Sequence, residues 1–137
     1  MILLDTDVLT LLFQGHERVV DRMQSSEDDV TTSVITWIEV LQGRFAAILK
    51  AAGTEQLLQA QDRLQQTIES FASLPIVPID RAGAEQFDKL LRSKKLKKLG
   101  RGDLLIASIA LSRRATLVTR NARDFRQVSG LVVEDWT

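Results

Sequence analysis

The chain alternates short apolar runs with longer segments in which apolar residues recur every three or four positions. A short apolar run bounded by polar residues is typical of a buried strand, and the longer period is typical of an amphipathic helix. The short runs predict strands at residues 2–5, 30–32, 76–79, 115–119 and 131–133. The periodic segments predict helices at residues 8–13, 16–26, 33–50, 55–70, 81–91 and 104–111. This order of elements predicts an α/β fold in which helices cover both faces of a mostly parallel sheet.

Polar residues at the starts of the periodic segments predict where several helices begin. Ser33, Thr54 and Asp103 each stand directly before such a segment, and we expect them to act as N-caps. The helices at 33–50 and 55–70 are separated by a short break, which predicts an αα-hairpin over residues 44–74.

Other segments differ from this regular pattern. The proline in Ile76-Val77-Pro78-Ile79 favours an edge position or a strand end. Residues 92–101 are strongly basic and predict a loop or a fraying helix end, and residues 120–125 predict a polar loop. The helix at 104–111 is apolar nearly all round, so we expect it to be central and buried.

Composition narrows the class of protein. The 137 residues suffice for a single domain, residues 1–137, with a substantial core. The chain has no cysteine, which excludes disulfides, thiolate zinc sites and a thiol nucleophile, and which fits the cytosol. No apolar run approaches the roughly 20 residues that span a bilayer, and the N-terminus lacks the pattern of a signal peptide. We therefore expect a cytoplasmic protein without a membrane segment.

Charge is unevenly distributed although the formal net charge is zero. Residues 1–75 hold 5 of the 18 Lys and Arg residues and 11 of the 18 Asp and Glu residues, which gives 5 − 11 = −6. Residues 76–137 hold the other 13 basic and 7 acidic residues, which gives +6. Such asymmetry favours an anionic partner on one face, and a solvated basic surface is the alternative.

Four carboxylates stand where the hydrophobic pattern alone would not place them. Asp5 follows a predicted buried strand, Glu39 lies between apolar residues of a helix, Asp103 opens an apolar helix, and Asp124 follows the strand at 115–119. Buried carboxylates are unfavourable unless they are paired or bound to a metal. Oxygen ligands without a nearby His or Cys favour Mg²⁺ or Mn²⁺ over zinc. Taken singly, Asp103 is also a typical N-cap, Glu39 fits a solvent-exposed helix face, and Asp124 fits an Asx-turn.

Further polar residues lie beside these four. Asp7 either contributes to the same metal through water or caps the helix at residue 8, and the cap is the favoured interpretation. Thr6, Thr119 and Asn121 are placed to orient ligands or metal-bound water, and they are also typical cap and turn residues. His16 is the only histidine, and we expect it on the surface, which argues against histidine-based catalysis.

Four short motifs and the C-terminal segment resemble those of one protein family. The motifs occupy residues 4–9, 32–40, 102–107 and 118–125, and the closing segment occupies residues 130–136. In this order they resemble the acidic motifs of PIN domains, and in particular those of VapC-type toxins, the ribonuclease half of type II toxin–antitoxin pairs. The resemblance covers the whole chain and implies a three-layer α/β/α fold with endoribonuclease activity that depends on Mg²⁺ or Mn²⁺.

The resemblance also assigns roles to residues and partners. It implies that Asp5, Glu39, Asp103 and Asp124 are catalytic residues and hold the metal. Asp124 occupies a position at which family members vary, and many relatives have Asn at the position of Asp7. The implied partners are a VapB-type antitoxin, a second copy of the chain and an RNA substrate, with tRNA, rRNA and mRNA all open. If the substrate is RNA, as the resemblance implies, we expect basic residues of the positively charged half to contact its backbone. These residues are Lys97, Lys98, Arg101, Arg120 and Arg123.

Two other functions remain open from the sequence. Asp5-Thr6-Asp7-Val8 also resembles the opening motif of haloacid-dehalogenase-like phosphatases, in which the first aspartate is a covalent nucleophile. That family has a further acidic residue four positions after the one matched by Asp103, where this chain has Ala107. The other alternative is a PIN-like interaction module without catalytic activity, and the intact set of four carboxylates argues against it.

Overall fold

Five parallel strands form the centre of the protein. The structure is a computed structural model that describes residues 1–137. Its single sheet has the strand order β3-β2-β1-β4-β5, and every neighbouring pair is parallel. The strands are β1 (Ile2–Leu4), β2 (Val30–Ser33), β3 (Ile76–Val77), β4 (Thr116–Val118) and β5 (Val132–Glu134). The predicted sheet is therefore confirmed, with β1 as its central strand and the proline-bounded β3 at one edge.

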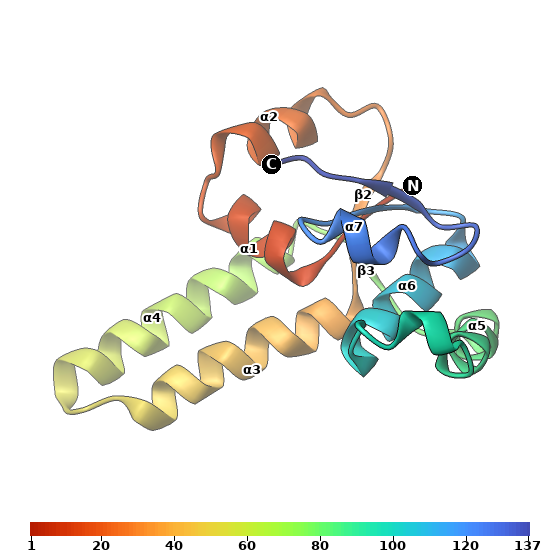
Figure 1. Ribbon diagram of the computed structural model, residues 1–137. Helices are drawn as coiled ribbons and strands as arrows, with labels where there is room; N and C mark the ends of the chain where they lie inside the picture. The colour runs from red at the N-terminus through yellow and green to blue at the C-terminus, as the bar shows by residue number, and fades with distance from the viewer.

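Helices form the connections between the parallel strands (Figure 1). Two helices connect β1 to β2, two connect β2 to β3, and a single short helix joins β4 to β5. The helices are α1 (Thr6–Phe13), α2 (Glu17–Ser25), α3 (Val34–Lys50), α4 (Thr54–Phe71), α5 (Arg81–Leu91), α6 (Arg101–Arg113) and α7 (Ala122–Phe125). No helix is both long and apolar enough to cross a membrane.

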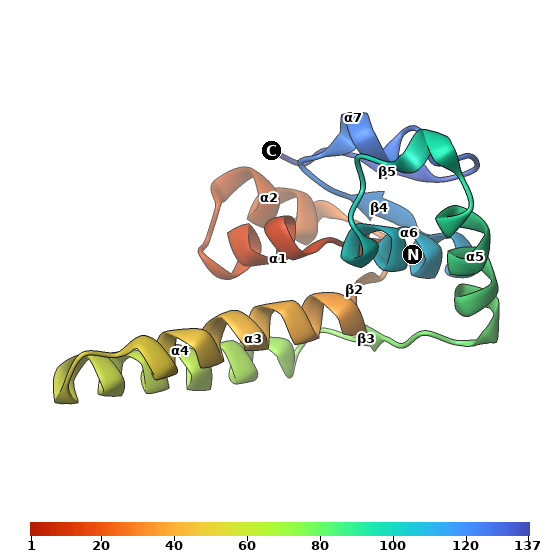
Figure 2. The ribbon, with the colours of Figure 1, turned by 60° about the horizontal axis from the view of Figure 1, so that its bottom comes forward.

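The alternation of side chains along β1 divides the core between two faces of the sheet. Leu3 packs in a cluster with residues of α5, α6 and α7. Its neighbours Ile2 and Leu4 point to the other face and pack with residues of α1, α2 and the end of α4. Figures 1 and 2 show these helices on either side of the strands, which gives the three layers that the resemblance implied.

Helix α6 is the most buried helix, as its apolar sequence predicted. Its residues Leu104, Ile106, Ala107, Ser108, Ile109 and Ala110 are all buried. Ser108 is accommodated because its hydroxyl donates to the carbonyl of Leu104 at 2.6 Å. Since a rigid, buried helix fixes the position of its own first turn, α6 is a firm support for Asp103.

Helices α3 and α4 form the predicted αα-hairpin, which projects from the rest of the protein (Figures 1 and 2). Several large apolar side chains along it are exposed, among them Phe45 and Leu49, of which Leu49 is 70% exposed. The base of the hairpin joins the core through Val40 and Phe71. The hairpin therefore presents much of its surface to solvent or to a partner.

Three predicted caps are wrong by one to three residues. Helix α1 begins at Thr6 because Asp5, not Asp7, is the N-cap, and its Oδ1 accepts from the N–H of Val8 at 2.9 Å. Helix α6 begins at Arg101 with Gly100 as N-cap, so Asp103 lies inside the first turn. Helix α4 begins at Thr54 itself, after Gly53 with its positive φ of 100°.

Two segments without an apolar pattern contain short helices. Residues 94–96 form a single 3₁₀ turn within the segment 92–101. Residues 120–125, predicted to be a loop, include α7, and the prediction is wrong there. A helix of four residues is too short for its periodicity to be recognised in the sequence.

Candidate functional site

The carboxyl ends of β1 and β4 define the centre of the candidate site. The chain runs from β1 to β2 and β3 on one side of the sheet, and then to β4 and β5 on the other. Ligands in parallel α/β sheets bind outside the carboxyl ends of the strands at such a point of reversal. Asp5 follows β1 there, and its N–H donates to the carbonyl of Val118, the last residue of β4, at 3.0 Å.

Asp5 is a buried carboxylate with an unusual pKa. Its side chain is only 7% exposed. Burial raises its pKa to about 6 from 3.8, although the hydroxyl of Thr119 and the N–H of Val8 act in the opposite direction. The neighbouring charges of Asp7 and Asp103 raise the pKa further. Asp5 is thus held by its cap hydrogen bond in a place where its charge is unfavourable without a cation.

Helices α3 and α6 bring Glu39 and Asp103 to the same place. Burial raises the pKa of each, and the charge of Asp103 also raises the pKa of Glu39. A Cβ atom at Gly102 would lie 3.3 Å from Oε1 of Glu39, so this carboxylate lies against the first turn of α6. The residues that sequence reasoning selected from distant parts of the chain therefore meet in space.

Asp7 also belongs to this group of carboxylates. The preferred interpretation of Asp7 as a helix cap is wrong, since Asp5 has that role. Its charge raises the pKa of Asp5, Glu39 and Asp103, so Asp7 lies near all three. The sequence contained a signal for this role of Asp7. Asp5 precedes it by two residues, and only one of the two aspartates can be the N-cap of the helix. We define Asp5, Asp7, Glu39 and Asp103 as the acidic cluster.

Asp124 lies at the margin of the acidic cluster. It stands in the only turn of α7 and is partly buried. Its charge raises the pKa of Asp103, the effect on Asp103 being smaller than those of burial and of Asp7. Of the three carboxylates whose pKa is raised, Asp103 is the one that the charge of Asp124 affects.

Hydroxyl groups surround the acidic cluster. The Oγ1 atoms of Thr6 and Thr36 are hydrogen-bonded at 3.1 Å, and Ser33 Oγ donates to Thr36 Oγ1 at 3.4 Å. A hydrogen bond from Thr6 to Glu39 opposes the rise in the pKa of Glu39. Sequence reasoning missed Thr36, which is fully buried. Its position three residues after Ser33 and three before Glu39, on one helix face, was the available signal.

Thr119 and Asn121 lie on the β4 side of the cluster. Thr119 is fully buried beside Asp5, and its Oγ1 accepts from the backbone N–H of Asn121 at 3.0 Å. Because this acceptor interaction leaves the hydroxyl hydrogen free, Thr119 is able to donate to the carboxylate of Asp5. Asn121 is the N-cap residue of α7, but its side chain makes no cap hydrogen bond.

The donor set fits a hard divalent cation. All side-chain donors of the acidic cluster are oxygen atoms. The only histidine, His16, instead caps α2 by accepting from the N–H of Val19 at 3.4 Å. His16 is partly exposed at the start of α2. No group of three or more Asp, Glu or His side chains in the structure has the spacing to hold a metal ion directly. Mg²⁺ keeps several waters and needs only one or two direct carboxylate ligands, so the donor set remains suitable for it.

The basic residues selected for RNA contacts are all exposed, and none of them forms an ion pair. Arg101 lies in the first turn of α6 with its guanidinium 5.2 Å from the centre of the Phe87 ring. Arg123 directly precedes Asp124 in α7. These two therefore stand next to residues of the candidate site, whereas Lys97 and Lys98 lie in the preceding loop.

The raised pKa of Asp5 predicts how stability depends on pH in metal-free, chelator-containing buffer. Between pH 3.8 and about 6 the folded protein binds more protons at Asp5 than the unfolded chain does. Asp5 therefore lowers the free energy of unfolding as pH rises through this window, by about 3 kcal/mol in total. Asp5→Asn keeps a cap acceptor and removes the charge, so it should exceed the wild type in stability above pH 6 and lose this advantage toward pH 4.

Urea unfolding of both proteins across this pH range measures the difference. Asp62→Asn, which removes an exposed carboxylate on α4, is the matched control and should leave the pH profile of stability unchanged. An Asp5→Asn profile parallel to that of the wild type would contradict the assigned burial of a charged Asp5.

Comparison with known proteins places this arrangement in a family. Residues 2–131 match the family model described as PIN domain. Ribonuclease VapC1 of Haemophilus influenzae (strain R2866) is 27% identical over 138 residues, which cover 98% of this chain and 97% of that relative. The tRNA(fMet)-specific endonuclease VapC of Shigella flexneri is 26% identical over 139 residues, with 98% and 97% covered.

A solved structure agrees with these sequence relatives. A DNA bound VapBC from Salmonella typhimurium contains a chain with a TM-score of 0.80 and 26% identity, and the match covers 100% of both chains. Because the family model spans nearly the whole chain and the parallel sheet carries the acidic cluster at its carboxyl edge, this chain belongs to the PIN domain family.

Proposed function

We propose that the chain is a VapC-type endoribonuclease toxin that hydrolyses RNA phosphodiester bonds with the help of Mg²⁺ or Mn²⁺. The observation that carries the proposal is the acidic cluster at the carboxyl end of the central strand, where burial and neighbouring carboxylate charges raise the pKa of Asp5, Glu39 and Asp103. Raised carboxylate pKa values in a surface site are typical of catalytic groups. The names of the relatives, ribonuclease and endonuclease, support the same reaction class.

The roles of the carboxylates follow from their positions. We assign metal binding, directly or through metal-bound water, to Asp5, Glu39 and Asp103, with Asp124 as a fourth and weaker contributor. Asp7 contributes its charge to the same place and would act on the ion through water. Thr6 and Thr119 orient Glu39 and Asp5 through hydrogen bonds, as outer groups around metal ligands commonly do.

The bound ion would supply a water of lowered pKa and stabilise negative charge on the phosphate in the transition state. The chain itself fixes the reacting geometry, because Asp5 is held by the start of α1 and Asp103 by the buried helix α6. Arg101 lies in the same helical turn as Asp103, Arg123 directly precedes Asp124, and both arginines are suited to bind the phosphates of the RNA backbone. Such contacts position the substrate without selecting its sequence.

The neighbouring proteins suggest the biological setting. The Salmonella typhimurium relative is a DNA bound VapBC, and other similar structures are also VapBC toxin–antitoxin complexes. We infer that a VapB-type antitoxin restrains this chain and that the chain pairs with a second copy. The exposed apolar residues of the α3–α4 hairpin offer surface for these contacts. The relative from Shigella flexneri is specific for tRNA(fMet), which makes tRNA the first substrate to test.

The two alternatives have less support. A phosphatase would use Asp5 as a nucleophile, but Asp5 is buried and accepts the cap hydrogen bond from Val8. The haloacid-dehalogenase-like phosphatases have an additional acidic residue where this chain has Ala107, and Ala107 is fully buried in α6. A non-catalytic interaction module has no need of a cluster of repelling carboxylates that lowers stability.

Substitution of each carboxylate by its amide tests the site. Asp5→Asn, Glu39→Gln and Asp103→Asn should each lower the rate of RNA cleavage by at least about 10²-fold, since each weakens the binding of the metal ion that would stabilise charge on the reacting phosphate. Asp124→Asn should have a smaller effect because Asp124 lies at the margin. Cleavage of a tRNA pool is measured with Mg²⁺ or Mn²⁺, and chelation should abolish it.

Asp62→Asn and Asp88→Asn are matched controls, since they remove exposed carboxylates on α4 and α5. Circular dichroism verifies that each variant is folded. Cleavage by Asp5→Asn at the wild-type rate would contradict the assignment, and unchanged cleavage after chelation would contradict metal dependence.

Gly102→Ala tests the position of Glu39 without removing a charge. The added Cβ would lie 3.3 Å from Oε1 of Glu39, so this carboxylate must shift by a few tenths of an ångström. Cleavage should fall several-fold, less than the roughly 10²-fold loss that a 1 Å displacement causes. Stability should rise by up to about 1 kcal/mol, because Ala is the better helix former. Reduced stability together with unchanged cleavage would show that Glu39 does not depend on this contact.

A further inference from the structure

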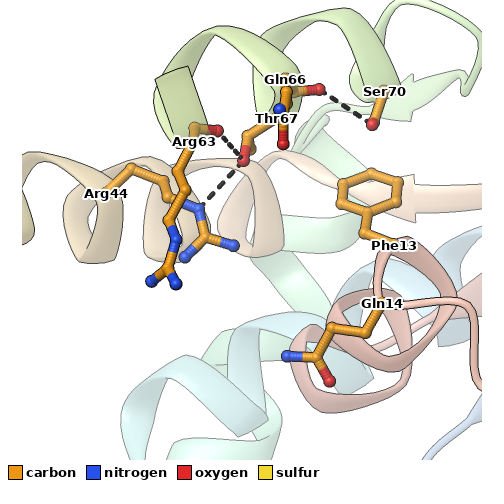
Figure 3. Close-up of a pocket in the computed structure, with 7 residues that line it drawn as sticks. All are labelled: Phe13, Gln14, Arg44, Arg63, Gln66, Thr67 and Ser70. Carbon is orange, nitrogen blue, oxygen red and sulfur yellow. Dashed lines mark hydrogen bonds between the residues drawn. The ribbon is translucent and has the colours of Figure 1, made fainter. Parts of the chain in front are cut away.

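A polar hollow of about 340 Å³ lies between the end of α1 and the two helices of the hairpin (Figure 3). No residue of the acidic cluster lines it, and the proposed reaction does not use it. Its walls consist almost entirely of side chains that donate hydrogen bonds. The lining residues that matter here are Gln14, Arg44, Arg63, Gln66, Thr67 and Ser70.

Arg44 is held in a fixed orientation at this hollow. Its Nε donates to Oγ1 of Thr67 at 3.0 Å, and the Thr67 hydroxyl donates to the carbonyl of Arg63 at 2.8 Å (Figure 3). Thr67 is buried between the two helices, which keeps this chain of hydrogen bonds in place. The two terminal nitrogens of Arg44 have no acceptor in the protein. One guanidinium is therefore oriented in advance and has free donors.

Arg63 adds a second positive charge without a counter-charge. Its side chain forms no hydrogen bond and no ion pair, since the three ion pairs of the structure involve other arginines. Figure 3 shows the side chains of Arg44 and Arg63 extending to the same side of the hairpin. No carboxylate lines the hollow. Two like charges in this arrangement repel each other until an anion lies between them.

The chemistry of the hollow favours a phosphate as that anion. Arginine, glutamine and serine donors are the groups that proteins use for phosphate oxygens. Phe13 is the only apolar lining residue, and its ring packs edge-on against Phe71 at 5.1 Å between centroids. The hollow therefore lacks the apolar pocket that anchors a protein side chain at an interface.

Helices α1 and α3 connect the hollow with the acidic cluster. Helix α1 follows Asp5 and ends at Phe13, beside the hollow. Helix α3 carries Glu39 and, five residues later, Arg44, a rise of about 7.5 Å along the helix axis. Because five residues turn a helix by about 140° beyond one full turn, Glu39 and Arg44 lie on different faces of α3, and an RNA strand that reaches both sites follows the surface around this helix.

We propose that the Arg44–Arg63 hollow binds a backbone phosphate of the RNA substrate, outside the bond that is cleaved. The inference rests on the proposed function and adds a second contact point for the substrate to it. A contact of this kind raises affinity for RNA of any sequence and extends the length of RNA that the protein covers.

Binding of a fluorescent single-stranded RNA in metal-free buffer, followed by anisotropy, tests the proposal apart from cleavage. Arg44→Gln/Arg63→Gln should weaken binding by at least about tenfold, and the slope of log K against log salt should become shallower by about 0.7 for each lost phosphate contact. Lys50→Gln/Lys89→Gln removes the same charge from exposed positions and should change affinity less than about twofold.

Arg63→Gln alone is the variant to use if the double variant unfolds, because the exposed Arg63 side chain forms no hydrogen bond and no ion pair. A double or single variant with the affinity and salt slope of the wild type overturns the proposal. A labelled octaglutamate peptide is the second probe. If the substitutions weaken peptide binding and leave RNA binding unchanged, the hollow accepts a protein carboxylate and the RNA assignment is wrong.

Failure of this inference is distinguishable from failure of the proposed function. A wild-type protein that cleaves RNA, paired with variants of unchanged RNA affinity, contradicts only the phosphate site in the hollow. A wild-type protein that neither binds nor cleaves RNA contradicts the proposed function itself, and the hollow then has no role in RNA binding.

Discussion

The burial of Asp5 at the end of the central strand is the constraint on which the rest of the site depends. The strand β1 ends at Leu4 and α1 begins at Thr6, so Asp5 has no room to move into solvent. Its carboxylate stabilises α1 as the N-cap, yet burial and the charges of Asp7 and Asp103 raise its pKa. A buried carboxylate of this kind makes the fold less stable than a neutral side chain would. A cation or an equivalent positive charge at the site would remove this cost.

The parallel sheet explains how residues from distant parts of the sequence meet at Asp5. All five strands end at one edge, and the helices that follow or precede them bring Glu39 and Asp103 to that edge. The buried helix α6 fixes Asp103, whereas the α3–α4 hairpin extends outward and carries the arginines of the polar hollow. The same helix α3 thus contributes a carboxylate near its start and a guanidinium farther along. A carboxylate and a guanidinium at separate positions on α3 suit a substrate that carries negative charge along its whole backbone and is cleaved at one point.

Much of the fold could be predicted from the sequence because hydrophobic periodicity is a local property. The helix at Arg81–Leu91 has the predicted bounds, and apart from the short helix α7 the order of strands and helices is as expected. Ser33 caps α3 as predicted, whereas two other cap positions were wrong because Asp5 and Gly100 begin their helices earlier than the apolar pattern does. In the site, Asp5, Glu39 and Asp103 were selected correctly as neighbours. Asp7 and Thr36 had local signals in their spacing from Asp5, Ser33 and Glu39, whereas the Arg44–Arg63 pair depends on a contact between helices, which no local pattern contains.

The central claim is that the acidic cluster binds a divalent cation, and calorimetric titration with Mn²⁺ tests it most directly. The wild type and Asp62→Asn, whose substituted residue is exposed on α4, should bind Mn²⁺ with equal affinity. Asp5→Asn and Asp103→Asn should each lose at least about tenfold in affinity, as changes to metal ligands and their supports do. Absence of Mn²⁺ binding by the wild type, or equal binding by wild type and Asp5→Asn, would contradict the account.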